Sequence, residues 1–154
     1  MAIRPEFNFP SLDAAKVERL ADLASQLDGA GPGQCDDELR DFNESAGTDI
    51  PLAEFQGIYG GMEHDSWVRN VLCEPFVAAT PAPTDDEALE LIARLTSASG
   101  EEWEQFFWIR VLEHHLDPRI SDLIHWPGEY FGDGDNSREL SPQDILDTAR
   151  KSKP

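Results

Sequence analysis

The sequence predicts an all-α protein made of two small helical domains. Apolar residues recur at three- and four-residue spacing in most segments, and runs that alternate apolar and polar residues are scarce. Three prolines fall between positions 75 and 83 and predict an extended linker, because proline lacks a backbone N–H and restricts the residue before it. We therefore expect helical domains at 1–74 and 84–154, on either side of a linker at 75–83.

Four helices are expected in the first domain. Ser11 is the expected cap of a helix that reaches about Leu27, where the glycine-rich stretch 29–33 ends it. Pro51 suits the first turn of a later, short helix. The three remaining helices are expected over 36–45, 51–58 and 64–74.

The second domain repeats that order of long and short helices. Thr84 followed by Glu87 predicts a capping box at the start of a helix that ends before Gly100. The next helices are expected over 101–116, over 120–126 where Pro127 and Gly128 end it, and from the cap Ser141 to about Lys151. The shared order is consistent with an old duplication, and equally with two unrelated helical domains.

The charge of the chain restricts its partners. Its 154 residues include 31 acidic and 12 basic side chains, and the net charge is −19. Because nucleic acid and anionic membranes bind proteins through lysine and arginine, this balance argues against both as direct partners. A basic protein is the partner that such a surface attracts.

Two features predict a cytoplasmic protein. The chain has no run of about 18 apolar residues that could span a membrane, and its opening segment lacks the apolar centre of a secretory signal. Cys35 and Cys73 lie far apart without CxxC spacing, so we expect two reduced, structural thiols rather than a disulfide.

No arrangement of side chains predicts catalysis or metal binding. His114 and His115 are adjacent on an expected helix and point about 100° apart, which hinders shared coordination of one ion. Glu139 follows Asp133 too closely for the glutamate of a calcium-binding loop. Phosphate-binding loops and nucleophile motifs do not occur in the sequence. We expect no enzyme, no cofactor and no metal site.

The expected helix at 101–116 is apolar almost all round. In a small domain, such a helix needs cover on two faces. The favoured interpretation packs one face into its own domain and the other against the first domain. In the alternative, Trp103 or Trp108 meets a partner.

The expected short helix carries side chains that are typical of a binding hot spot. Leu123 and the isoleucine after it supply the inward anchor. Asp122, His125 and Trp126 project outward from a helix that Pro127 holds rigid. An indole offers a large apolar area at low entropic cost, and a carboxylate attracts a basic partner.

Three motifs of the second domain occur in a specific order: TDDEALELI from Thr84, EHHLDPRISDLIHWP from Glu113, and SPQDIL from Ser141. Together they resemble the immunity proteins of DNase-type colicins and S-type pyocins. Those proteins carry a first helix that begins T-x-x-E-F-L-x-L-V, then E-H-P-x-G-S-D-L-I-Y-Y-P, a short acidic loop and S-P-x-x-I-V. The likeness covers about residues 83–150.

The resemblance implies a four-helix, colicin-immunity-like bundle with a short third helix. It also implies tight binding to a basic HNH-type nuclease toxin beside its active site, where charge and bulk block DNA. Carried over by position, Asp122, His125 and Trp126 occupy the hot spot, where the family has an aspartate and two tyrosines. Ser121 would hold the start of the short helix and Pro127 its end, and both are expected among the partner-binding residues.

The family's specificity helix corresponds to 101–113, where Trp103, Glu104 and Trp108 are secondary candidates for partner binding. The His125-Trp126 pair keeps aromatic area but changes the hydrogen-bonding groups, and the flanking loops are longer than in the family. These departures indicate either a different cognate nuclease or a domain that has lost the activity.

Two other functions fit the sequence. One is an acidic adaptor that self-associates through the helix at 101–116, and the other is a DNA mimic that binds nucleic-acid-binding proteins in general. The resemblance implies nothing about residues 1–80.

Overall fold

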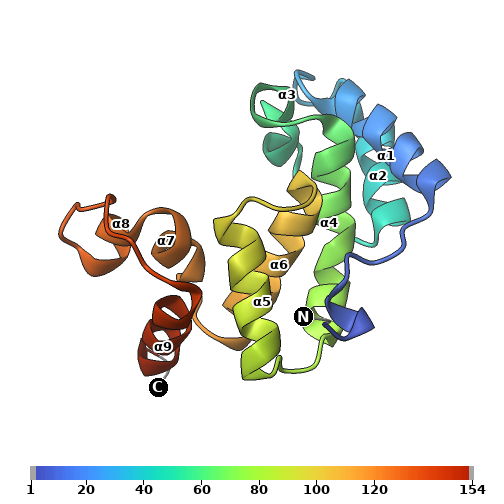
Figure 1. Cartoon of the computed structure of the whole chain (residues 1–154). Helices are drawn as coiled ribbons and strands as arrows, with labels where there is room; N and C mark the ends of the chain where they lie inside the picture. Colours follow the sequence, from blue (N-terminus) through green and yellow to red (C-terminus); the bar gives the residue numbers. More distant parts are fainter. Residues whose placement is uncertain (1–2, 153–154) are drawn as a thin grey trace. The chain divides into compact units, whose positions relative to one another are not determined.

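The computed structural model describes residues 3–152, apart from the side chains of Tyr59 and Ser152 (Figure 1). Regular structure in this range is helical throughout, with no strand, so the expected all-α class is confirmed. No helix in the described range is long and apolar enough to cross a lipid bilayer. The chain divides into two compact units: Ser11–Cys73, and the residues up to Pro10 together with those from Glu74 onward.

The unit Ser11–Cys73 is built on an aromatic core. Its elements are α1 (Ala14–Leu27), α2 (Asp36–Ala46), the 3₁₀ helix η2 (Leu52–Phe55), α3 (Ile58–Gly61) and the first part of α4 (His64–Ala79). Helix α1 packs against α2 and η2. The rings of Phe42 and Phe55 meet edge to face with centroids 5.0 Å apart, and Trp67 covers both.

Two expectations for this unit are wrong: the cap of its first helix and the continuity of the helix at 51–58. Asp13, rather than Ser11, caps α1, and its carboxylate accepts the N–H of Ala15 at 3.0 Å. The expected helix at 51–58 is split into η2 and α3, because Gly57 between them adopts a left-handed conformation with φ +83°. Helices α1 and α2 otherwise follow the expected ranges within a few residues.

The expected linker at 75–83 is wrong over its first part. Helix α4 continues through Pro75 to Ala79. Pro75 is exposed, while Cys73 and Val77 on either side of it are buried. Burial of that apolar face outweighs the loss of one helical hydrogen bond at the proline. Of residues 75–84, only 80–84 lack regular structure.

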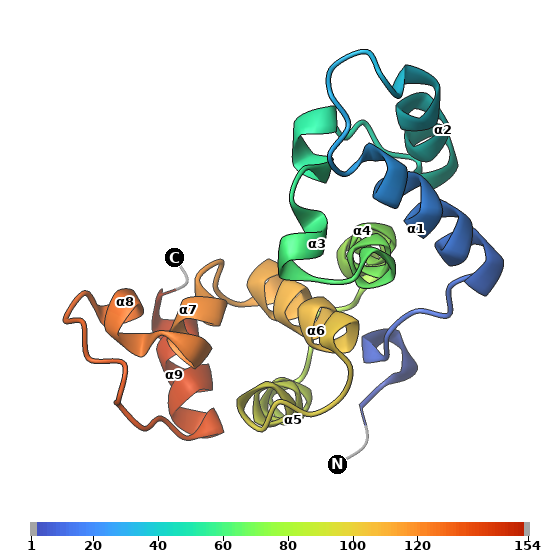
Figure 2. The same cartoon turned by 90° about the horizontal axis from the view of Figure 1, so that it is seen from above.

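The second unit is organised around α5 (Asp85–Thr96). This helix contacts α6 (Glu102–His115), α7 (Ile120–His125) and α9 (Pro142–Ser152), and α7 also contacts α6, α9 and α8 (Pro127–Phe131) (Figure 2). Both predicted caps are present: Thr84 and Glu87 form a capping box, and the Ser141 hydroxyl accepts the N–H of Asp144 at 3.1 Å.

The first residues of the chain belong to this second unit rather than to the first domain, where the sequence placed them. Residues 5–7 form a 3₁₀ turn, η1 (Pro5–Phe7), and Phe7 is fully buried. The Arg4 guanidinium binds the Glu87 carboxylate on α5, with an Nη2–Oε1 distance of 2.8 Å. The Phe9 ring meets Phe107 of α6 edge to face at 5.9 Å. Apolar burial and one ion pair therefore fix this segment.

The expected helix at 120–126 ends one residue early, and Pro127 does not act as a stop. It opens α8 instead, at the first helical position. Proline is favoured at such a position because its missing N–H has no helical partner there and its φ already suits the helix.

A candidate partner-binding surface on α7 and α8

The two short helices are anchored by apolar side chains on their inner faces. Ile120 and Leu123 of α7 are fully buried, and Pro127 and Gly128 of α8 are buried as well. These anchors leave the outer side of α7 and the bend between the helices facing solvent.

Trp126 lies at that bend and is the most exposed large hydrophobic side chain among the described residues, at 57%. Its backbone is fixed, because its N–H donates to the Asp122 carbonyl at 2.6 Å and its carbonyl accepts the N–H of Glu129 at 2.9 Å. His125, just before it, is also exposed. The bend therefore presents an indole from an ordered backbone.

Asp122 lies one helical turn before Trp126 and is half-buried. Its carboxylate lies 3.7 Å from the Arg119 Nε. The predicted hot-spot residues Asp122, His125 and Trp126 therefore occupy consecutive turns of one short element, with one arginine beside the carboxylate.

A buried carboxylate that the sequence analysis missed holds the two helices together. Asp117 is 5% exposed and accepts both the backbone N–H of Arg119 at 2.9 Å and the hydroxyl of Tyr130 at 2.7 Å. The Arg119 guanidinium lies over the Tyr130 ring at 5.0 Å and donates to the Glu129 carbonyl at 3.0 Å. An Asp-Pro pair directly before a helix was the available sequence signal, since aspartate readily bonds the following backbone.

This arrangement corrects the role expected for Ser121. Ser121 is the second residue of α7 rather than its cap, and the cap position belongs to Arg119, whose side chain makes no capping bond. The carboxylate of Asp117 organises that turn instead. Ser121 is half-buried and Pro127 is buried, so neither offers the open surface of Trp126.

The secondary candidates lie elsewhere. Trp108 is 3% exposed, and its indole N–H donates to the Phe7 carbonyl at 2.9 Å. It is therefore a core residue, and the prediction that it meets a partner is wrong. Glu104 accepts the N–H of Glu101 at 2.9 Å and caps α6. Trp103 is half-buried beside it. Both residues lie in the first turn of α6, whereas the end of α6 that leads into α7 is the opposite one (Figure 2).

Acidic groups converge where α6 meets α7. Arg110 donates through Nε to Glu74 at 2.8 Å and lies 3.7 Å from Glu113. Burial raises the pKa of the Glu113 carboxyl, Arg110 partly offsets the rise, and the negative charges of Glu74 and Asp122 add to it. Asp122 therefore lies close enough to contribute to the electrostatic environment of Glu113.

Behind α8, an acidic loop folds back on Gly128. The N–H of Gly128 donates to the Asn136 side-chain oxygen at 2.8 Å, and its carbonyl accepts the N–H groups of Asp133 and Gly134, each at 3.1 Å. A Cβ on Gly128 would lie 2.5 Å from the backbone of residues 134 and 135, so only glycine fits there. Arg138 pairs with Asp133 and covers the Phe131 ring at 4.3 Å.

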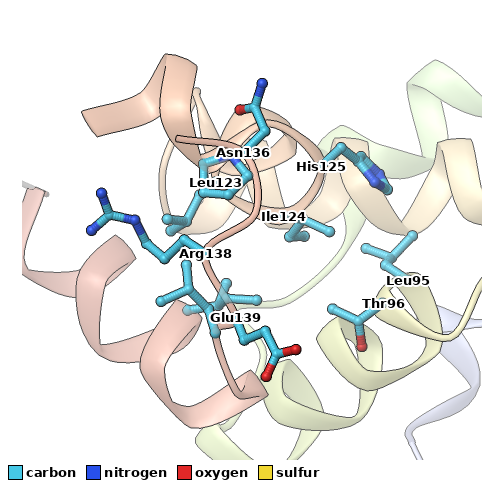
Figure 3. Close-up of a pocket in the computed structure, with 11 residues that line it drawn as sticks. Leu95, Thr96, Leu123, Ile124, His125, Asn136, Arg138 and Glu139 are labelled. Carbon is cyan, nitrogen blue, oxygen red and sulfur yellow. The ribbon is translucent and has the colours of Figure 1, made fainter. Parts of the chain in front are cut away.

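A cavity of about 280 Å³ lies beside α7, between the end of α5 and the segment that leads from the loop to α9 (Figure 3). His125 and Pro127, which flank Trp126, both line it. Within residues 3–152, no group of three or more histidine, cysteine, aspartate or glutamate side chains could hold a metal ion. Comparison with known proteins finds no matching family model, no matching curated protein and no matching solved structure.

Proposed function

We propose that this protein binds a basic nuclease toxin and inhibits it by contact, as the resemblance to colicin and pyocin immunity proteins implies. The observation that carries the proposal is the exposed indole of Trp126, held on an ordered bend beside the carboxylate of Asp122.

An exposed tryptophan on a fixed backbone suits a binding hot spot. Hot spots are rich in tryptophan because the ring buries a large area and loses little side-chain entropy on binding. The bonds from Trp126 to Asp122 and Glu129, and those from Asp117 to Arg119 and Tyr130, order the bend before any partner arrives. Pre-ordering lowers the entropic cost of association.

The charge around the bend suits a basic partner. Burial raises the pKa of Glu113, and the negative charges of Glu74 and Asp122 add to the rise, with Arg110 as the opposing cation. A lysine or arginine from a DNA-binding surface would relieve this repulsion. Oppositely charged surfaces also accelerate encounter.

Self-association through the helix at 101–116, the basis of the adaptor alternative, loses its main support. Phe107, Trp108, Val111 and Leu112 of α6 are buried within their own unit. An apolar face that is already covered offers nothing to a second copy of the helix.

The test first asks whether a gene next to this one encodes an HNH-type nuclease, and then uses the purified nuclease domain. Calorimetry is expected to detect tight binding, and Trp126→Ala is expected to weaken it by about 2 kcal/mol, or roughly thirtyfold. Phe76→Ala is the matched control, because Phe76 is an aromatic residue on α4 that is 46% exposed and is expected to leave affinity unchanged.

Two outcomes contradict the proposal at different levels. Binding that is indifferent to both Asp122→Ala and Trp126→Ala refutes the site. Absence of binding, or of any neighbouring nuclease gene, refutes the function. Competition by duplex DNA across unrelated basic proteins would instead support the DNA-mimic alternative.

A further inference from the structure

The cavity beside α7 has a mixed lining of apolar and polar side chains. Leu95, Ile124 and Leu140 supply apolar walls, while Thr96, His125 and Glu139 contribute polar groups (Figure 3). The Arg138 guanidinium points away from Leu95 and Thr96, toward its partner Asp133. The cavity is therefore open to an apolar group, with one carboxylate at its edge.

Its size selects the kind of occupant. The volume of about 280 Å³ lies at the lower limit of small-molecule sites. An apolar cavity of about 150 Å³ already accepts a benzene ring. One large apolar side chain therefore fits, whereas a cofactor does not.

One wall of the cavity is an open backbone edge. Residues 138–140 lie in no helix, and neither their N–H nor their C=O groups bond to any other described residue. Residues 138–140 form no strand, but their N–H and C=O groups can bond the main chain of an extended peptide, as a sheet edge does in strand addition, while one side chain enters the cavity. The edge and the cavity together provide both contacts.

The negative charge around the cavity favours a peptide that carries basic residues. Between residues 129 and 139 the chain carries four carboxylates and one arginine. That arginine, Arg138, is already paired with Asp133, whereas the rim carboxylate of Glu139 has no cation partner among the described residues. A second copy of this chain is a poor occupant, because its net charge of −19 is repelled here.

We infer that this groove takes an extended segment of the partner protein in which apolar and basic residues alternate. One apolar side chain enters the cavity, and a neighbouring lysine or arginine pairs with Glu139. This inference rests on the proposed function and extends its surface, since His125 and Pro127 both line the cavity and flank Trp126.

A model peptide tests the groove without the toxin. The probe is acetyl-Lys-Leu-Lys-Leu-Lys-Leu-amide, titrated into the ¹⁵N-labelled full chain and followed by NMR. Saturable shifts are expected at the amides of residues 138–140, with about tenfold weaker binding of the same peptide carrying glutamate in place of lysine. Shifts confined to other regions, or equal binding of both peptides, overturn the inference.

Thr96 offers a matched pair of variants at the mouth of the cavity. Thr96 is exposed, so Thr96→Phe fills the cavity from its rim without disturbing the core, while Thr96→Ala leaves it open. Thr96→Phe is expected to weaken peptide binding by about tenfold and Thr96→Ala by less than about twofold. Equal affinity of the two variants overturns the inference.

The same variants separate this inference from the proposed function. If Trp126→Ala weakens nuclease binding and Thr96→Phe does not, the groove plays no part and the proposed function stands. If the peptide binds as expected and no nuclease binds, the proposed function fails and the groove remains a peptide site.

Discussion

The ion pair between Arg4 and Glu87 is expected to hold the first residues of the chain in place. The Glu87 carboxylate is 6% exposed and accepts the Arg4 side chain at 2.8 and 2.9 Å, the Arg4 backbone N–H at 3.0 Å and the Thr84 N–H at 3.0 Å. In Glu87→Gln, an amide N–H₂ would face these donors in a site with little water. We expect the free energy of unfolding to fall by about 2 kcal/mol, the range for charged hydrogen bonds to a partly exposed arginine.

The loss should depend on pH in a defined direction. The Arg4 hydrogen bonds lower the pKa of Glu87 from 4.5 to about 2, against the opposing effect of burial. A carboxyl group with a lowered pKa in the folded state stabilises the protein fully above its unfolded pKa. The difference between the wild type and Glu87→Gln is therefore expected to be constant above about pH 5 and to shrink as the pH falls toward 2.

Thermal unfolding followed by circular dichroism measures the effect, with the Trp108 indole N–H resonance as a local probe of the Phe7 contact. The expected fall in midpoint at pH 7 is about 5 °C or more. Glu90→Gln on the same helix is the control, because its single turn-to-turn pair with Arg94 contributes less than about 0.5 kcal/mol. Equal midpoints for wild type and Glu87→Gln at pH 7, or a difference that persists unchanged near pH 2, would refute the reasoning.

Two further predictions concern the bend that carries Trp126. Gly128→Ala forces a Cβ against the backbone of the acidic loop and is expected to lower the free energy of unfolding by about 2–3 kcal/mol. Gly60→Ala is the control, because open space surrounds Gly60 and stability should not fall. Equal stability of Gly128→Ala and the wild type in urea unfolding would contradict the observed packing. Tyr130→Phe removes a 2.7 Å bond to the buried carboxylate of Asp117 and is expected to reduce stability by about 1–2 kcal/mol in the same assay. A neutral result would mean that water replaces the hydroxyl.

Local signals in the sequence predicted most of the helices. The capping box of Thr84 and Glu87 spans one turn, so its chemistry is visible in four consecutive residues. The same holds for the cap at Ser141. The prediction was wrong where local helix propensity and burial disagree. Pro75 predicts a break in the helix, but burial of the neighbouring Cys73 and Val77 keeps the helix intact.

Contacts between distant residues could not be predicted from local patterns. Glu87 was identified as a capping residue, yet its ion-pair partner, Arg4, lies 83 positions away in the sequence. Trp108 was a candidate for partner binding because nothing near it in sequence shows that the Phe7 carbonyl, 101 positions away, accepts its N–H. The candidate hot-spot residues Asp122, His125 and Trp126 form a local group, so their common location on α7 and its end was predictable.

The distribution of ion pairs in the second unit bears on the basic partner that we propose. Every arginine that the structure describes in the second unit pairs with a carboxylate of the same unit; these residues are Arg4, Arg94, Arg110, Arg119, Arg138 and Arg150. These arginines therefore hold helices and loops, and most of the carboxylates outside the pairs are exposed, with the buried Asp117 as an exception. A basic surface approaching α7 meets no unpaired guanidinium that would repel it. The arginines thus stabilise the fold, and the negative charge of the exposed carboxylates remains available to attract a basic protein. Salt weakens this attraction at separations beyond about 10 Å, the screening length near 0.1 M ionic strength.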